Sequence, residues 1–196
     1  AEEAAAWFFE YCSRERTRID KEEGHPARFE IRSKDNKTNE KHFAFIKRMP
    51  GLLYNREFVI KFLWRNEGHD SIIVAGQSVD DINPDYGGNM GNLVRGTSKL
   101  LLTATNVEKI GNTPQCKLEM LQYFDLGGFI PTTILDKRMP QALKILQNLS
   151  SSFQQDEEVD RAALTSFANI MRNEHQDYSE EEKEAIRKGK EFYEKC

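Results

Sequence analysis

The chain has 196 residues, with 28 basic and 32 acidic side chains and a net charge of −4 at neutral pH. This length favours one domain with a hydrophobic core and a helical appendage over two full domains. The negative balance excludes a general cationic field for nucleic acid, so we expect no nucleic-acid partner. Three widely spaced cysteines fit a reducing compartment better than a disulfide framework, which favours a cytoplasmic protein.

The sequence shows neither a membrane-spanning segment nor a secretory signal. No apolar run approaches the ~20 residues of a spanning helix, and the start lacks a basic region. The chain begins with Ala1 and enters a helical pattern almost at once. We therefore interpret Ala1 as a cut point within a longer polypeptide.

The first part of the chain changes from helical to strand periodicity. Residues 2–12 carry apolar side chains at helical spacing, which predicts a short amphipathic helix. The alternating stretches 28–34 and 42–47 flank a polar turn and predict a β-hairpin. Residues 56–64 and 71–79 follow as two further strands joined by a tight turn.

A second pair of strands and a long helix follow a loop that is rich in Asp, Asn, Gly and Pro. The loop spans residues 80–92, and the predicted strands are 93–105 and 116–124. Pro131 stands where a helix with an apolar stripe begins. Pro140, inside that helix, predicts a kink or a restart because it removes a backbone donor.

The last part of the chain is polar, acidic and helical. Ser179 followed by Glu182 predicts a capping box at the start of its final helix. We therefore divide the chain into a strand-rich domain over residues 1–153 and an acidic helical extension over residues 154–196.

No stretch has the spacing of a catalytic or metal-binding motif. His25, His42, His69 and His175 stand alone, without a second ligand at helical spacing, so no metal site is expected. The glycines of residues 87–91 lack the strand, helix and Lys-Ser/Thr pair of a phosphate loop. No serine or cysteine has the setting of an activated nucleophile, so we expect neither enzyme activity nor a cofactor.

Four short motifs follow one another in a specific order. They are Asn55-Arg56-Glu57-Phe58-Val59, Ile72-Ile73-Val74-Ala75-Gly76 with Ser78-Val79, Val94-Arg95-Gly96, and Asp125-Leu126-Gly127-Gly128-Phe129-Ile130-Pro131. Their order and spacing over residues 1 to about 150 resemble the steroidogenic-acute-regulatory-related lipid-transfer (START) domain. Each motif alone is short, and the specificity of the resemblance comes from the four together.

The resemblance implies an α+β helix-grip fold, in which a curved antiparallel sheet wraps a long C-terminal helix. Between them a tunnel would take one lipid, such as a phospholipid, a sterol or a fatty-acid-like molecule. Transfer or sensing of that lipid would need no chemistry. An apolar tunnel shields an acyl chain or a sterol from water, at roughly 0.8 kcal/mol per buried CH₂.

The same resemblance implies the residues of the site. The implied lipid-cavity residues are Phe43, Phe45, Phe58, Ile60, Phe62, Trp64, Val74, Ser98, Leu100, Leu102, Leu118, Met120, Gln122, Phe129, Leu135, Met139, Ala142, Leu143 and Leu146. The implied gate, which would contact an anionic membrane surface transiently, comprises Met49, Leu52, Leu53 and Tyr54. A plain surface loop is the alternative interpretation of this second group.

The sequence also departs from the family pattern. Sterol-carrying members place an acidic residue and an arginine in the tunnel, at about the positions of Phe43 and Phe62. We therefore expect an apolar lining, which fits a ligand with little polar recognition or a core that is simply filled. The family's N-terminal helix and about three strands have no counterpart, which favours a fragment or an exposed sheet edge.

Two functions remain open from the sequence. One is a lipid carrier or sensor. The alternative is an interaction module of a larger signalling or scaffold protein, with a filled cavity and a protein partner bound through residues 156–196. That alternative predicts an exposed apolar stripe on Ala163, Phe167, Ile170 and Met171. Hydrolase activity, as in START members fused to catalytic domains, would reside outside these residues.

Overall fold

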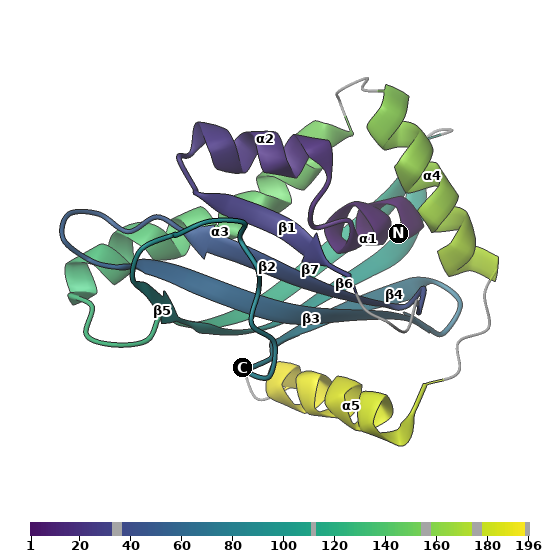
Figure 1. Cartoon of the computed structure of the whole chain (residues 1–196). Coiled ribbons are helices and arrows are strands. Elements are labelled where there is room, and N and C mark those ends of the chain that lie inside the picture. Colours follow the sequence, from purple (N-terminus) through teal and green to yellow (C-terminus); the bar gives the residue numbers. More distant parts are fainter. Residues whose placement is uncertain (33–36, 111–112, 154–157, 174–177, 195–196) are drawn as a thin grey trace.

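The computed structural model describes residues 1–32, 37–110, 113–153, 158–173 and 178–194. Within these ranges, seven strands form one sheet and five helices pack against its two faces (Figure 1). The helices are α1 (Glu2–Phe9), α2 (Arg14–Glu22), α3 (Thr132–Ser152), α4 (Glu158–Asn173) and α5 (Glu180–Glu194). The strands are β1 (Ala27–Ile31), β2 (Glu40–Lys47), β3 (Asn55–Glu67), β4 (Ser71–Ser78), β5 (Leu93–Arg95), β6 (Thr97–Ile110) and β7 (Thr113–Asp125).

The sheet is antiparallel along its main path, in the order β1-β2-β3-β4-β6-β7, and the short β5 pairs in parallel with β3. The predicted hairpin and the predicted period-two alternation of the third strand are confirmed. Phe43 lies opposite Ile60, and Phe62 lies opposite Gly76. A Cβ on Gly76 would lie 2.6 Å from the Phe62 ring, so this position needs glycine for the two strands to pack.

Several boundaries differ from the sequence prediction. α1 ends at Phe9 rather than at residue 12, and a second helix, α2, follows where none was predicted. Residues 93–105 are not one strand, because the chain changes partner at Gly96 between β5 and β6. A Cβ on Gly96 would lie 2.6 Å from the Phe58 ring and 2.9 Å from the Asp125 carbonyl oxygen. These neighbours explain why glycine stands where the chain changes partner.

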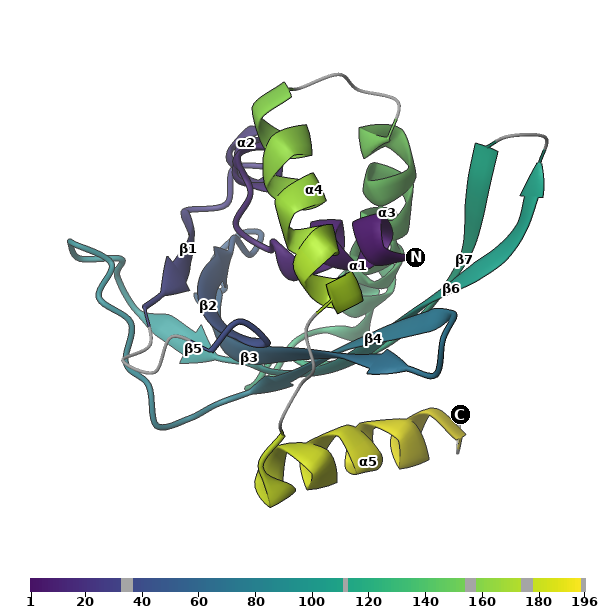
Figure 2. The ribbon, with the colours of Figure 1, turned by 90° about the vertical axis from the view of Figure 1, so that its right-hand side faces the viewer.

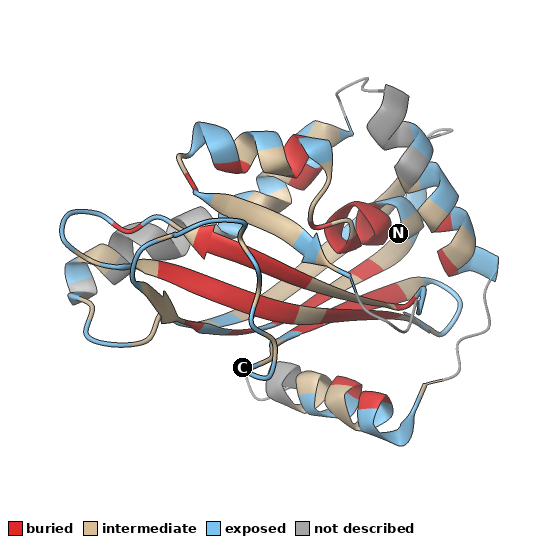
Figure 3. Cartoon of the chain, viewed as in Figure 1, coloured by how far each residue is buried: buried red, intermediate tan, exposed pale blue. Residues whose placement is uncertain are grey.

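Helices cover both faces of the sheet (Figure 2). α1, α2, α3 and α4 lie on one side, and α5 crosses the other side. We call the first side the inner face. Its core is built from aromatic and aliphatic side chains of the central strands together with nearly all of α1, and Figure 3 shows this buried centre in red.

α3 and α4 extend the inner layer. α3 begins directly after Pro131, as predicted, and the helix runs through Pro140 without a restart. In α4, Phe167 stacks on Phe9 with ring centroids 5.2 Å apart, and Met171 is fully buried. The stripe that the interaction hypothesis expected to be exposed therefore packs against α1, while the side chain of Ala163 lies outside the described residues.

α5 is attached to the outer face by both polar and apolar contacts. The predicted capping box is confirmed, because the Glu182 amide donates to Ser179 Oγ (3.2 Å) and the Ser179 amide donates to Glu182 Oε2 (2.8 Å). Lys37 pairs with Glu182 at 3.0 Å, and Ile186 is buried. In the described part of the chain, no helix is both long enough and apolar enough to cross a membrane.

Candidate functional site

A cavity of about 190 Å³ lies between α2, one end of the inner face and α3. Its lining residues are Trp7, Tyr11, Arg16, Ile19, Asp20, Glu23, His25, Arg28, Phe45, Lys47, Arg48, Met49, Phe58, Gln122, Phe124, Leu126, Lys144, Ile145 and Asn148. Two walls can be distinguished, one aromatic and one charged.

The aromatic wall is formed by the sheet. Phe45 on β2 stacks on Phe58 on β3, with ring centroids 5.1 Å apart and planes 15° apart. Phe124 on β7 meets Phe58 edge to face at 5.7 Å, and Tyr11 contacts Phe45 at 5.6 Å. The period-two alternation of these strands directs all three Phe rings to the inner face. This wall suits an acyl chain or another apolar group.

The charged wall comes from α2 and the strands beside it. Arg28 on β1 donates to both carboxylate oxygens of Asp20 on α2, at 2.5 and 3.0 Å, and Lys47 Nζ lies 3.6 Å from Asp20. Burial raises the pKa of Asp20, but hydrogen bonds and charge from Arg28 and the charge of Lys47 outweigh it, so the pKa is lowered overall. The Asp20 carboxylate therefore neutralises Arg28.

Arg16, also on α2, is placed differently. Its guanidinium lies 4.2 Å from the Tyr11 ring centroid and 4.8 Å from that of Trp7, and it donates to the Phe8 carbonyl at 3.2 Å. Among the described residues, no carboxylate forms an ion pair with it. Burial, followed by the charge of Arg28, lowers the pKa of Arg16 to about 9, so the group stays charged at neutral pH. A buried cation without a counter-ion is costly and attracts an anion.

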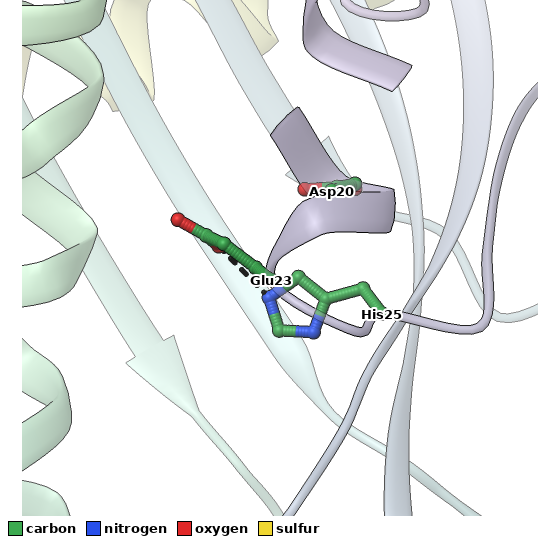
Figure 4. Close-up of side chains that lie close together, drawn as sticks. All are labelled: Asp20, Glu23 and His25. Carbon is green, nitrogen blue, oxygen red and sulfur yellow. Dashed lines mark hydrogen bonds and ion pairs between the residues drawn. The ribbon is translucent and has the colours of Figure 1, made fainter. Parts of the chain in front are cut away.

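Asp20, Glu23 and His25 form a cluster whose potential ligand atoms lie within 4.8 Å of one another (Figure 4). The sequence suggested that His25 stands alone, but the fold brings two carboxylates close to it. These atoms are already engaged: His25 Nδ1 accepts from the Arg48 amide at 3.2 Å, and Nε2 lies 3.1 Å from Glu23 Oε2. Because both Asp20 oxygens are bonded to Arg28, a cation would have to displace a guanidinium. The cluster is an ion-pair network in the wall of the cavity.

The structure separates the sequence-predicted site residues into four groups. Phe45, Phe58 and Gln122 line the cavity. Buried elsewhere on the inner face are Phe43, Ile60, Phe62, Trp64, Val74, Ser98, Leu100 and Leu102. Partly buried against this core are Leu118, Met120 and Leu146. Phe129 and Leu143 are 87% and 55% exposed and do not line the cavity, and the side chains of Leu135, Met139 and Ala142 lie outside the described residues.

The predicted gate residues are also divided. Met49 is buried and lines the cavity. Leu52 is fully exposed, Tyr54 is 57% exposed, and Leu53 is half-buried. The loop therefore presents one apolar side chain to the cavity and two to solvent.

Sequence reasoning missed the charged wall and expected an apolar lining. Arg16, Asp20, Arg28 and Lys47 line the cavity instead. The sequence did contain one signal. Serine is a common N-cap residue, and Ser13 accepts from the Arg16 amide in this role. A helix that begins there places Arg16 and Asp20, four residues apart, on one face.

A second hollow lies on the outer face. A groove of about 580 Å³ separates α5 from β3, β4 and β6, with Leu63, Ala75, Leu101 and Ile186 among its lining residues. Lysines including Lys61 and Lys99 border it. It is larger than the inner cavity and has no aromatic wall.

No protein-family model matches the sequence, and no curated protein matches it. Solved structures do. Human STARD10 superposes with a TM-score of 0.60 and 17% identity, over 93% of this chain and 71% of that one. A fragment of a STAR-related lipid transfer protein from Xanthomonas axonopodis gives a TM-score of 0.52 and 18% identity, over 78% of this chain and 80% of that one. The chain therefore has the α+β helix-grip fold of START domains, which confirms the resemblance at the level of the fold.

Proposed function

We propose that the chain binds one amphipathic lipid in the inner cavity and carries or senses it without chemical change. The observation behind this proposal is the pairing of an aromatic wall with the buried Arg16, which forms no ion pair with a carboxylate of the described residues. The apolar part of the ligand would lie against Phe45, Phe58 and Phe124. Its anionic group, a carboxylate or a phosphate, would face Arg16. Of the two similar solved structures, the Xanthomonas axonopodis protein is a STAR-related lipid transfer protein, which fits this class of ligand.

The cavity must enlarge to take a whole lipid. At about 190 Å³ it is smaller than the roughly 300–1,000 Å³ of typical ligand pockets. α3 supplies Lys144, Ile145 and Asn148 to the lining, and the β2–β3 loop supplies Arg48 and Met49. Uptake would therefore displace α3, this loop, or both.

The exposed apolar side chains supply a second part of the proposal. Leu52 and Tyr54 on the β2–β3 loop and Phe129 before α3 project into solvent, and Arg48 on the same loop is also exposed. Apolar tips with a neighbouring cation suit transient contact with an anionic membrane surface. We propose that lipid is exchanged while these residues touch the bilayer.

Native mass spectrometry with a fatty acid and its methyl ester tests the ligand class. We expect a one-to-one complex with the fatty acid. Arg16→Met should weaken that complex about 10-fold or more, because a hydrogen bond to a charged group contributes about 1.5–3 kcal/mol. Binding of the neutral ester should change little. Lys99→Met, which removes a cation from the outer groove, is the matched control and should leave both complexes intact.

Two results would contradict this ligand assignment. One is a folded protein that stays empty with every lipid. The other is equal loss of the acid and the ester in Arg16→Met, which would show that the substitution damages the cavity as a whole.

One observation favours a second function, that of an interaction module. α1 and the turn after it fill much of the inner face: Phe8 of α1 stacks on Phe62 at 5.9 Å, and Tyr11 of the turn meets Phe62 edge to face at 5.1 Å. In this alternative the cavity is a packing defect, and the protein binds a partner through residues 156–196. A persistently empty protein would favour it.

A further inference from the structure

Arg56, at the start of β3, connects two segments that are far apart in sequence. Its Nη1 donates to the Tyr54 carbonyl, its Nε donates to the Leu126 carbonyl at 2.7 Å, and its Nη2 donates to the Gly127 carbonyl at 3.2 Å. We call residues 48–55 and 126–131 the entrance segments. They lie at the same end of the sheet (Figure 1).

Each entrance segment has one buried side and one exposed side. Met49 and Leu126 line the cavity, whereas Leu52 and Phe129 project into solvent. The cavity wall and the proposed membrane surface thus belong to the same two pieces of chain. Any motion that opens this end of the cavity must move at least one of them.

The guanidinium of Arg56 is suited to hold both pieces. The residue is only 3% exposed, and its side chain leaves the rigid β3 strand. A planar guanidinium can donate in several fixed directions at once, which a lysine ammonium on a flexible stem cannot reproduce. Hydrogen bonds from a charged donor are also stronger than neutral ones.

Two local hydrogen bonds shape the turns of the entrance segments, and the second comes from Asp125 at the end of β7. In the first, the Met49 amide donates to Asn55 Oδ1 at 3.1 Å. In the second, the Gly127 amide donates to Asp125 Oδ1 at 2.8 Å, and Gly127 has a φ of +66°, which glycine adopts without strain. Each turn is thus shaped locally, and Arg56 connects the two.

We propose that Arg56 is a positioning residue that joins the two entrance segments into one unit. When its hydrogen bonds to Tyr54, Leu126 and Gly127 break, both segments open together and the cavity opens with them. The statement about the cavity rests on the proposed lipid function. The coupling of the two segments does not, and it can be measured without any lipid.

Amide hydrogen exchange of the Arg56→Lys variant tests the coupling. We expect the Met49 and Gly127 amides to exchange about tenfold or more faster in this variant, because charge-assisted bonds to both segments are lost. Asn55→Ala and Asp125→Ala are matched controls. The first should accelerate exchange only in residues 48–55, and the second only around Gly127. Acceleration of one segment alone in Arg56→Lys would overturn the proposal.

A second measurement uses the unmodified chain and so does not depend on the folding of a variant. Low concentrations of urea should accelerate the Met49 and Gly127 amides in parallel, with one common opening free energy. Two separate opening free energies would overturn the proposal.

Lipid kinetics then connect the coupling to function. If the chain binds a fatty acid, Arg56→Lys should speed uptake and release several-fold while the Kd stays within about twofold. Coupled amides in a chain that binds no lipid would support the joining of the segments and contradict the lipid function. Coupled amides with unchanged lipid rates would contradict the role of Arg56 in opening the cavity.

Discussion

The indole Nε1 of Trp7 lies 2.8 Å from the hydroxyl oxygen of Ser152, although 145 residues separate the two. The same indole donates to Glu15 Oε2 at 3.0 Å, and Ser152 donates to that oxygen at 2.7 Å. Three helices, α1, α2 and the C-terminal end of α3, therefore meet at one buried carboxylate. This junction anchors one end of the helix that borders the cavity.

Trp7→Phe should lower the free energy of unfolding by about 1–3 kcal/mol, because the buried Glu15 carboxylate loses a donor. Urea denaturation measures this loss. Arg18→Ala, which removes the exposed Arg18–Glu22 pair on α2, is a control and should change stability by about 0.5 kcal/mol or less. Equal effects of the two substitutions would show that the junction contributes nothing.

Phe8 and Phe129 provide a comparison of buried and exposed aromatic rings. Phe8 is 1% exposed and stacks on Phe62, so Phe8→Ala should cost about 3–5 kcal/mol in unfolding free energy. Phe129→Ala should cost about 0.5 kcal/mol or less, since the ring is in solvent. A large loss of stability in Phe129→Ala would mean that the segment before α3 is packed differently.

Stability should fall as the pH drops below about 6.5. Burial, followed by the charge of Lys47, lowers the pKa of His25 in the folded state, although Asp20 and Glu23 act in the opposite direction. The unfolded chain then binds the proton more readily, so the stabilisation present above the unfolded pKa is lost as pH falls through the folded pKa. His42 adds to this trend, since burial also lowers its pKa.

His25→Asn should make that pH dependence shallower, because asparagine keeps an acceptor for the Arg48 amide but does not titrate. Urea denaturation at several pH values between 7.5 and 5 measures the slope. An unchanged slope would contradict the assignment of this proton to His25.

Leu52→Glu should reduce binding to anionic vesicles about tenfold or more. The substitution removes an apolar side chain that would enter the bilayer and adds a negative charge that anionic lipids repel. Vesicle co-sedimentation measures the effect. Val107→Glu is the matched control, since Val107 is also an exposed aliphatic residue but lies near the other end of β6. Equal losses in both variants would mean that the contact is not specific to the β2–β3 loop.

The strands could be predicted from the sequence because their period-two alternation is strong. In β3, every second residue points to the same face of the sheet. The strand register places Phe58, Ile60 and Phe62 on the inner face, as expected. The long α3 was predicted for the corresponding reason, an apolar stripe with Pro131 before it. Both signals depend only on neighbouring residues, and the structure has a strand and a helix where they predict them.

α2 could not be predicted from a helical spacing of apolar residues, since Ile19 is the one aliphatic residue in its nine-residue sequence RERTRIDKE. Its helix is set by the Ser13 cap and by burial of Arg16 and Asp20 against α1 and β1. The charged cavity wall was missed with it, because ion pairs such as Arg28–Asp20 depend on how elements dock. Similarly, the need for glycine at position 96 depends on the distant Phe58 and Asp125.

Photo-crosslinking with a fatty acid that carries a diazirine in its chain tests the central claim most directly, with the adducts mapped by peptide mass spectrometry. The lipid-carrier proposal predicts adducts in the peptides that contain Tyr11, Phe45 or Phe124, with competition by unlabelled fatty acid. Adducts confined to the outer groove, at Leu63, Leu101 or Ile186, or no competable adduct at all, would contradict it.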